Sequence, residues 1–413
     1  MRFRIASPHR VSRSGTRLRR AAVIFGSVIA LGAAGATAAA AASSNPSVAA
    51  RTSAASSSTY KHACSAPSAP RMMQCMALIN TTVAQRSADA IGPNATPTGY
   101  GPSDFQKAYG LSSASSSGGS GETVYLVDVY DYPTAQADLN TYRSQYGLPA
   151  CGSGCFTKVS QTGSTTSLPR AAGSSGWDVE EALDMDMVSA ICPNCHITLV
   201  EANSASNNNL YTAENEAVKL GAKFISNSWG GSEYSGENSD ASTYFDHPGV
   251  AITVSAGDSP GPEFPAEAPD VTAVGGTTLH TSSTNSRGFT ESAWKSSGGG
   301  CSADETAPSW ETSSVTGCNG KRSDNDVSAD ANPNTGAAIY NSYSQSGWLE
   351  VGGTSESSPI IASVYALAGN PGSSTIPAQD IWSHEPNGLY AVGSGYSSTP
   401  GWGTPNGTSA FTG

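Results

Sequence analysis

Short apolar runs alternate with segments of helical periodicity along most of the chain beyond residue 120. An apolar run of about four to eight residues between turn residues predicts a strand buried on both faces. Strands separated by helices of about 10–15 residues predict βαβ units and a parallel sheet. The pattern therefore predicts an α/β fold: a doubly wound, mostly parallel sheet with helices on both faces, in a single large domain. The predicted strands are 124–129, 196–201, 223–228, 249–255 and 271–274, and the predicted helices are 134–146, 177–191, 210–220 and 358–367.

The beginning of the chain differs from the rest in composition. An arginine-rich start precedes an apolar run at 21–42 that ends in small residues, which predicts a signal peptide over 1–42. The run is long enough for a membrane anchor, but its alanines and glycines favour a cleavage site. Residues 43–95 are rich in serine and alanine, with a short helical stretch near 72–83, and predict a short leader or propeptide. The main domain is then expected over 96–413, with no stable membrane anchor.

Composition and charge narrow the class of partner. Hydrophobic residues make up 38% of the chain, which is enough for a sizeable core and excludes wholesale disorder. The chain has 21 Lys+Arg against 33 Asp+Glu, a formal net charge of −12, and several of its arginines lie in the predicted signal. A body this acidic argues against nucleic acid or an anionic membrane as partner.

The eight cysteines agree with export. An even number in an exported chain favours disulfides, and the spacing favours pairing between sequence neighbours. A zinc site is the alternative, because Cys192 and Cys195 with His196 resemble half of one, but no second Cys-x-x-Cys completes it. The predicted disulfides are Cys64–Cys75, Cys151–Cys155, Cys192–Cys195 and Cys301–Cys318.

One serine stands where a nucleophile is expected. Ser355 follows the glycine-rich turn Gly352-Gly353-Thr354 and precedes an apolar helix. The free N–H groups and the dipole at a helix N-terminus favour developing negative charge. Pro359 suits the first turn of such a helix. The other interpretation is that Ser355 is only an N-cap, a position where serine is common.

Two carboxylates share a face of the predicted helix 177–191. Glu180 and Asp184 are four residues apart, and apolar residues occupy the other sides of the helix. No Lys or Arg occurs between residues 171 and 218 to compensate their charge. Two close carboxyls in an apolar setting should have at least one raised pKa. The alternative is a solvated acidic surface helix.

Two strand ends offer further polar groups. Asp258 follows the apolar strand predicted over 249–255, where an active-site group is expected in an α/β sheet, although an Asx-turn or a helix cap would also explain it. Ser228-Trp229-Gly230 ends the strand before it and could line a substrate. A buried core tryptophan is the equally good interpretation of Trp229.

Four separated motifs carry a resemblance to a known family. They are Ser-Trp-Gly at 228–230, Ser-Ala-Gly-Asp at 255–258, Thr-Ala-Val-Gly-Gly-Thr at 272–277 and Gly-Gly-Thr-Ser at 352–355. They occur in the order of subtilisin-like peptidases, and the chain is most similar to the sedolisin family of serine-carboxyl peptidases. The resemblance covers about residues 97–412 and implies a subtilisin-like fold.

The resemblance also implies roles. Ser355 would be the nucleophile, Glu180 the general base, Asp184 its tuning partner, and Asp258 the oxyanion stabiliser that replaces the subtilisin Asn. The substrate-binding positions would be Ser228, Trp229, Gly230, Gly353 and Thr354. The implied protein is a secreted, extracellular, acid-active endopeptidase that acts on polypeptides, needs no cofactor for its chemistry and is a monomer. The short leader departs from the long folded prodomain of many sedolisins, which weakens the case for self-activation.

Two other functions stay open. An ordinary subtilisin is the first, because Asp128 at the end of the first predicted strand resembles the acid of that triad. Subtilisins also need a His-Gly-Thr-His-type helix, and none of the six histidines lies in one. The second is an inactive, secreted binding domain on the same fold. The presence of all four reactive groups argues against it.

The family resemblance extends to a calcium site near the C-terminus. Asp380 and Ile381 match its first half, and Gly393 and Gly395 match the start of its second half. Ser397 stands where the resemblance implies a second aspartate. Carboxylates supply most of the affinity for a hard cation, so we expect weak calcium binding or none.

Overall fold

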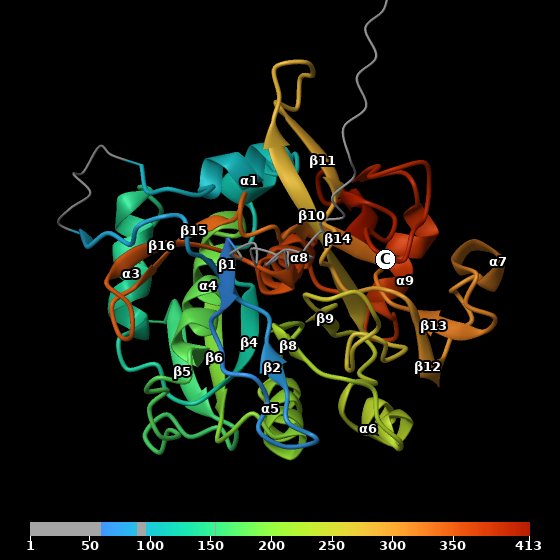
Figure 1. Ribbon diagram of the computed structural model, residues 1–413, viewed down its shortest axis with the longest axis horizontal. Coiled ribbons are helices and arrows are strands. Elements are labelled where there is room, and N and C mark those ends of the chain that lie inside the picture. The colour runs from blue at the N-terminus through green and yellow to red at the C-terminus, as the bar shows by residue number, and fades with distance from the viewer. Residues whose placement is uncertain (1–58, 89–95, 153) are drawn as a thin grey trace, which may run out of the picture. The chain divides into compact units, whose positions relative to one another are not determined.

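A mostly parallel sheet forms the centre of the computed structural model, which describes residues 59–88, 96–152 and 154–413 (Figure 1). Its central strand is β4 (Thr123–Val129), with β6 on one side and β7 on the other, all parallel. Antiparallel pairing enters only at the far edge, where β11 joins β10. The order is β5 (Phe156–Ser160), β6 (His196–Ala202), β4, β7 (Phe224–Asn227), β9 (Ala251–Ser255), β10 (Thr272–Thr281) and β11 (Phe289–Ala293), with β14 (Val327–Asp330) also on β10.

Helices cover both faces of this sheet. On one face α4 (Trp177–Ile191) packs against α8 (Thr354–Ala368), and α3 (Ala135–Gln145) packs against α4. On the other face α5 (Asn207–Lys219) packs against β4 and β6, and α6 (Glu237–Tyr244) lies beside α5. The predicted doubly wound α/β fold is confirmed. Functional groups are expected where β6 and β7 diverge from β4, because the strand order reverses there.

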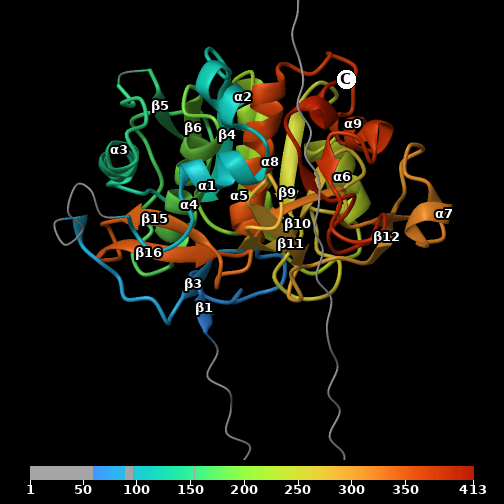
Figure 2. The same ribbon diagram turned by 90° about the horizontal axis from the view of Figure 1, so that it is seen from above.

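Smaller elements complete the described part of the chain. A second sheet consists of β1, β3, β16 and β15, which lie side by side in Figure 2. The remaining helices are α1 (Pro102–Ala108), α2 (Ser112–Ser117), α7 (Ser313–Thr316) and α9 (Pro377–His384), and η2 (Ser409–Phe411) is a 3₁₀ turn. The remaining strands are β1 (Tyr60–His62), β2 (Gln74–Cys75), β3 (Leu78–Asn80), β8 (Trp229–Gly230), β12 (Cys301–Thr306), β13 (Lys321–Ser323), β15 (Ala337–Asn341), β16 (Gly347–Gly352), β17 (Leu389–Tyr390) and β18 (Thr404–Pro405).

Element bounds differ from the sequence predictions where caps or partner strands decide them. Helix α4 has the predicted bounds, because apolar residues occupy every side of it and the whole helix is buried. Helix α5 begins at Asn207, three residues before the predicted start, and the extended Ser206 occupies its N-cap position without a side-chain capping hydrogen bond. Strand β10 continues to Thr281, well past the predicted end at 274, because β11 pairs with its second half.

The helical stretch predicted near 72–83 is wrong. This segment forms β2 and β3 instead, because neighbouring strands are available to both. Its apolar side chains, among them Met73, Leu78 and Ile79, are buried in the domain. The compact unit that contains all described residues begins at Ser57, so residues 59–88 of the expected leader lie within it, not apart from the domain expected over 96–413.

The four predicted disulfides are confirmed: Cys64–Cys75, Cys151–Cys155, Cys192–Cys195 and Cys301–Cys318. The zinc alternative is excluded, because Cys192 and Cys195 have no free thiolate to offer a metal. Within the described ranges, no helix has both the length and the hydropathy to cross a membrane. The predicted signal peptide over 1–42 lies outside the described residues.

Candidate active site

The candidate nucleophile Ser355 lies in the first turn of α8, not before it. Gly353 caps the helix with a φ of 97°, a conformation that favours glycine, and Ser355 is the second helical residue. The N-cap interpretation of Ser355 is therefore wrong, because Thr354 already has helical geometry. Pro359 then lies inside the helix and has no N–H to offer the Ser355 carbonyl. The Ser228 hydroxyl approaches that carbonyl oxygen at 3.4 Å.

The candidate base faces this serine from α4. Glu180 is fully buried, and burial raises its pKa well above the usual range, with a further contribution from Asp128. A side-chain hydrogen bond with Ser355 acts in the opposite direction on this pKa. The Ser355 hydroxyl donates to the Ser228 carbonyl oxygen at 3.2 Å, and Glu180 Oε1 has no partner. Since a hydroxyl rotates freely, Ser355 can donate to either oxygen.

The second carboxyl of the pair lies one turn along the helix. Asp184 accepts a hydrogen bond of 2.7 Å from the Ser228 hydroxyl. Burial raises the pKa of Asp184 well above its usual range, and Asp128 and Glu180 add to the shift. The surface-helix alternative is thus wrong, because both carboxyls of the pair are fully buried.

Sequence reasoning missed the role of a third carboxyl. Asp128 is the penultimate residue of β4, and neither of its oxygens has a hydrogen-bond partner. Burial raises the pKa of Asp128 to about 8. It acts electrostatically on Glu180 and Asp184, so the structure places it behind the pair rather than beside a histidine. Its position at the end of the central strand was the available signal.

Asp258 lies in the loop after β9 and contacts Thr354, the residue before Ser355. One oxygen, Oδ1, accepts hydrogen bonds from Thr354 N at 2.8 Å and Thr354 Oγ1 at 3.0 Å. The other oxygen, Oδ2, has no partner. Burial raises the pKa of Asp258 to about 8, and Glu263 adds to the shift. A protonated Oδ2 can therefore donate to an oxyanion formed near Ser355.

The predicted substrate edge is strand β8, and another segment of the same chain pairs with it. Strand β8 pairs antiparallel with β2, with Gln74 opposite Gly230 and Cys75 opposite Trp229. The Trp229 indole is fully buried and donates to the Val127 carbonyl oxygen at 2.8 Å. The core interpretation of this tryptophan is therefore confirmed for its ring, while a role of its backbone in lining a substrate stays a prediction.

Residues 73–77 contact the candidate active site at Ser228 and Glu180. Met76 N donates to Ser228 O at 3.2 Å, and Ala77 N donates to Glu180 Oε2 at 2.9 Å. A cleft of about 710 Å³ remains beside this segment, lined among others by Met76, Gly230, Asp258 and Glu263. Ser355 is fully buried in this arrangement.

The residues of the expected calcium site fit a cation poorly. Asp380 lies in α9 and is nearly buried, but within the described part of the chain it belongs to no group of three potential metal-ligating His, Cys, Asp or Glu side chains. Gly393, Gly395 and Ser397 lie in an exposed loop, where Ser397 N donates to Gly401 O at 3.2 Å. Asp380 thus remains the single carboxylate of that set, together with the carbonyl of Ile381.

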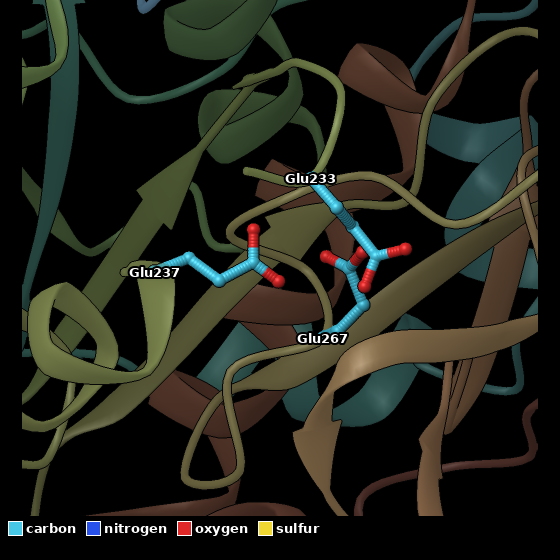
Figure 3. Close-up of side chains that lie close together, drawn as sticks. All are labelled: Glu233, Glu237 and Glu267. Carbon is cyan, nitrogen blue, oxygen red and sulfur yellow. The ribbon is translucent and has the colours of Figure 1, made fainter. Parts of the chain in front are cut away.

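A separate acidic cluster, Glu233, Glu237 and Glu267, could offer oxygens to a cation (Figure 3). One ligand oxygen of each lies within 4.8 Å of the others. Glu233 accepts a hydrogen bond from Ala303 N at 2.9 Å, and both oxygens of Glu267 lack a partner. Burial raises the pKa of Glu267 well above its usual range and that of Glu237 to about 8. No second observation points to a cation at this cluster, so we assign it no metal.

Comparison with known proteins adds independent evidence for the family of this chain. A family model described as the subtilase family matches residues 170–385, more than half of the chain. Sedolisin from Pseudomonas sp. (strain 101) is 29% identical over 374 residues, which cover 79% of this chain and 62% of sedolisin. Kumamolisin from Bacillus sp. (strain MN-32) is 27% identical over 317 residues, which cover 68% of this chain and 54% of kumamolisin. The chain thus spans less than two thirds of the length of these relatives.

A solved structure agrees with these relatives. Pseudomonas sedolisin, a serine-carboxyl proteinase complexed with two molecules of pseudo-iodotyrostatin, superposes with a TM-score of 0.63 at 28% identity. The match covers 75% of this chain and 96% of the sedolisin chain. The chain therefore belongs to the subtilase family and has the sedolisin-like form of the subtilisin fold.

Proposed function

We propose that this protein is a secreted, acid-active serine-carboxyl endopeptidase that hydrolyses polypeptides. One observation carries the proposal: α8, α4 and the loop after β9 bring Ser355, Glu180, Asp184 and Asp258 together beside the cleft that Asp258 lines. Within the described residues, no hydrogen bond joins a histidine to Ser355, Glu180 or Asp184, which argues for carboxyl rather than imidazole base chemistry. The similarity to sedolisin and kumamolisin supports a peptidase, and the solved Pseudomonas sedolisin is named a serine-carboxyl proteinase.

The geometry supports one sequence of steps. Ser355 Oγ attacks the carbonyl carbon of a bound peptide while Glu180 accepts the hydroxyl proton as general base. The carbonyl oxygen becomes an oxyanion, to which protonated Asp258 donates. The C–N bond breaks when Glu180 returns the proton to the leaving amine. Water then hydrolyses the Ser355 ester with the same base, and no cofactor enters these steps.

The other two buried carboxyls tune the base. Beyond burial, Asp128 and Asp258 raise the pKa of Glu180, and Asp128 and Glu180 raise the pKa of Asp184, because like charges cannot all ionise in one dry site. The three carboxyls share protons, and their combined titration decides when Glu180 can accept one. We infer that Asp184 positions and tunes Glu180, as the third member of a triad orients its base.

Asp258 gives the pH limit on the alkaline side. It donates only while protonated, so activity falls as pH rises through its pKa, which burial raises to about 8. When residues 73–77 leave, water reaches Asp258 and this pKa falls, because desolvation is the main cause of the shift. The proposal therefore places the pH optimum in acid and the loss of activity near neutrality.

Export and a monomeric state belong to the same proposal. Four disulfides support an oxidising compartment outside the cytosol. The predicted signal over 1–42 and the acidic body support secretion without nucleic acid or membrane as partner.

The test is casein digestion from pH 2 to pH 9 by the purified chain and its Ser355→Ala variant, each incubated first at pH 4. We expect digestion with an acid optimum for the chain and none for the variant. An optimum above pH 7 would instead favour an ordinary subtilisin. Equal digestion by both proteins would exclude Ser355 as the nucleophile, and a chain inactive under all conditions would favour the binding domain.

A further inference from the structure

The cleft beside the candidate nucleophile is lined by acidic side chains. Its volume is about 710 Å³, and the carboxyls that line it belong to Glu233, Asp258 and Glu263. Among the described residues that line it, Arg71 is the single lysine or arginine, and its guanidinium lies 4.6 Å from the centre of the Tyr234 ring. An excess of carboxyls in a cleft favours a cationic side chain over an anionic one.

Glu263 lies between two backbone segments of the active site. A Cβ built on Gly230, in strand β8, would lie 3.1 Å from Glu263 Oε2. A Cβ built on Gly257, directly before Asp258, would lie 2.8 Å from Glu263 Oε1. A side chain at either glycine would therefore displace this carboxyl. The two glycines leave room for Glu263 between the strand edge and the acid that donates to the oxyanion.

The Glu263 carboxyl has an oxygen without a partner. Its Oε2 is buried and has no hydrogen-bond partner, and burial raises the pKa of Glu263 to about 7. Glu233 differs, because it accepts hydrogen bonds from Ser302 Oγ at 2.5 Å and from Ala303 N at 2.9 Å. A buried acceptor without a donor costs free energy, which a donor of matching position recovers. Of these two glutamates, Glu263 is thus the one that lacks a donor.

Met76 shows which side chain of a bound peptide would reach Glu263. A Cβ built on Gly353 would lie 1.8 Å from the Met76 carbonyl oxygen and 2.9 Å from Asp258 Oδ2, so this carbonyl lies beside the oxyanion acid. A Cβ built on Gly230 would lie 3.3 Å from Met76 Cε, and Glu263 Oε2 lies near the same point. A residue whose carbonyl lies beside Asp258 therefore places the end of its side chain near Glu263.

Methionine ends where longer basic side chains continue. Counted in bonds from Cα, its Cε corresponds to Cε of lysine and to Nε of arginine. Lysine then adds an ammonium group with three donors, and arginine adds the rest of a guanidinium group that has five. Hydrogen bonds between such a cation and a carboxylate are shorter and stronger than those between neutral groups. A lysine or arginine in place of methionine would therefore bring a donor to the Glu263 carboxyl.

We propose that Glu263 is a specificity-determining residue and selects lysine or arginine as the residue that precedes the scissile bond. This inference deepens the proposed function and rests on it. The Glu263 carboxylate accepts hydrogen bonds from the ammonium or guanidinium group of the substrate. Ser355, Glu180 and Asp258 keep their roles, and no further bond forms or breaks. Norleucine has the carbon chain of lysine without the ammonium group, so it leaves Glu263 Oε2 without a donor.

The selection should depend on pH. Without a cation, Glu263 holds a proton below its pKa of about 7, whereas a bound cation favours the carboxylate. The preference for a basic residue should therefore increase from pH 4 to pH 6.5. The titratable and charged groups that line the cleft or interact with Glu263 are His62, Arg71, Glu233, Asp258 and Asp324. Asp258 acts on the oxyanion of every substrate alike, so its own titration cancels in a ratio of two substrates.

The experiment measures kcat/KM for internally quenched peptides that differ only in the residue before the scissile bond, which is lysine, arginine or norleucine. The full chain is incubated first at pH 4 and assayed at pH 4, 5.5 and 6.5, and mass spectrometry identifies the bond that is cut. The test variant is Glu263→Gln, which keeps the size of the side chain. The matched control is Glu233→Gln, because Glu233 lines the same cleft but already has donors.

We expect the wild-type chain to cleave the lysine and arginine peptides with a kcat/KM about tenfold or more above that of the norleucine peptide at pH 6.5, since hydrogen bonds to charged groups are the strong ones. The ratio should be smaller at pH 4. In Glu263→Gln the ratio should fall to about one and lose its pH dependence, because the titrating carboxyl is gone. In Glu233→Gln the ratio should stay close to the wild-type value.

The outcomes separate this inference from the proposed function. Equal kcat/KM for the basic and norleucine peptides in the wild type at every pH would overturn the selection and leave the peptidase intact, and this measurement does not depend on the folding of a variant. A preference that survives in Glu263→Gln, or that Glu233→Gln removes equally, would overturn the assignment to Glu263. No cleavage of any peptide by any form would overturn the peptidase and the inference together.

Discussion

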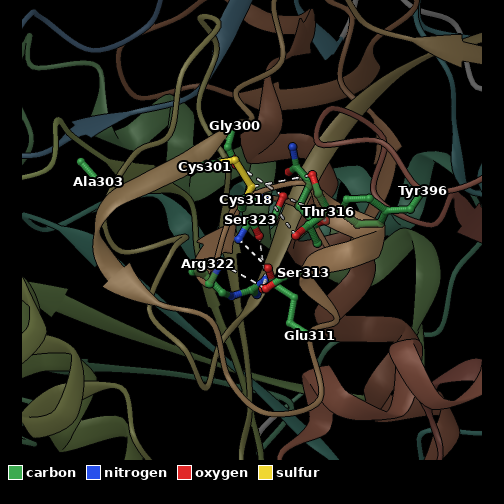
Figure 4. The surroundings of a disulfide bond; sticks show 12 residues. Gly300, Cys301, Ala303, Glu311, Ser313, Thr316, Cys318, Arg322, Ser323 and Tyr396 are labelled. Atoms are coloured by element: carbon green, nitrogen blue, oxygen red, sulfur yellow. Dashed lines mark hydrogen bonds and ion pairs between the residues drawn. A yellow bond between two sulfur atoms is a disulfide. The ribbon is translucent and has the colours of Figure 1, made fainter.

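Two buried groups of carboxyls in this protein solve the same electrostatic problem in opposite ways. Around Ser355, the carboxyls Asp128, Glu180, Asp184 and Asp258, here called the cleft group, have no cation among the groups that shift their pKa values. Beside the Cys301–Cys318 disulfide, Glu311 pairs with the buried Arg322 (Figure 4). Asp326 pairs with the same arginine. Burial without a cation disfavours the charged form of a carboxyl, whereas a neighbouring arginine favours it.

The difference separates a group that can exchange protons in a reaction from a group that stabilises the fold. The cleft group can gain and release protons near physiological and acid pH, which a general base and an oxyanion donor require. The Arg322 group has its partners fixed at 2.8 Å to Glu311 and 2.6 Å to Asp326, and Trp382 Nε1 donates to Asp326 Oδ1 at 2.7 Å. It links the strand β13 to α9 and does not exchange protons with substrate.

The comparison predicts the largest effect for the base itself. Glu180→Gln keeps the size of the side chain but removes the proton acceptor, so kcat should fall by roughly 10³-fold or more while folding is preserved. The measurement is casein turnover at the acid optimum. Asp186→Asn is the matched control on the same helix, because Asp186 is buried and accepts from Tyr340 N outside the cleft. Comparable losses in both variants would refute a specific role for Glu180.

The Arg322 group should dominate stability. Arg322→Met leaves two buried carboxylates without their cation, which should cost about 3–5 kcal/mol in the free energy of unfolding at pH 7. Urea unfolding measures it. Lys219→Met is the control, because Lys219 is largely exposed beside Glu216 and should cost less than about 1 kcal/mol. A small loss for Arg322→Met would mean that this group is not a structural ion pair.

The cleft group should make stability depend on pH. Its carboxyls have folded-state pKa values above their unfolded values, so the folded state binds extra protons in between. For Asp128 and Asp258 that window runs from the ordinary 3.8 to about 8. Their stabilising contribution is present in full below the window and is lost as pH rises through it. The melting temperature of the Ser355→Ala chain should therefore fall from pH 4 to pH 8, and a rise over that range would contradict the assignment.

A smaller effect is expected at the oxyanion position. Asp258→Asn supplies an amide that donates at every pH, so the alkaline limb of the casein pH profile should flatten. Activity at the acid optimum should fall by about tenfold or less, because one donor is exchanged for another. An unchanged alkaline limb would show that another group sets it.

Calcium should have the smallest effect. With Ser397 in place of a carboxylate, a chelator should shift the melting temperature by less than about 2 °C, because binding stabilises only when free metal exceeds Kd. Ser397→Asp should create a calcium-dependent rise, and Ser394→Asp on the same loop should not. A large chelator-induced drop in the wild type would sink this prediction.

The sequence predicted best those features that depend on local pattern. Helix α4 could be read to the residue, and the spacing of Glu180 and Asp184 on one face required only helical geometry. The pairing of the cysteines also followed from nearness in sequence. Long-range pairing was not predictable in this way: β2 and β3 exist because β8 and β16, far away in the chain, offer edges to them.

The sequence also did not predict which charged groups surround a candidate residue in space. Asp128 could be read as a subtilisin triad acid because its place at the end of a strand was visible, while the carboxyls around it were not. The start of α8 at Thr354 was missed because the run Thr-Ser-Glu-Ser-Ser lacks apolar periodicity, although it is buried against the sheet.

Trp229 gives this molecule an optical signal for the state of its cleft. Its backbone is hydrogen-bonded to β2, while its indole is packed among Tyr211 and Phe245 and is shielded from water. Departure of β2 exposes one side of the residue and not the other. Its emission should therefore change in intensity more than in wavelength. The chain has seven tryptophans, so the difference in emission between the chain and a Trp229→Phe variant would report opening of the cleft.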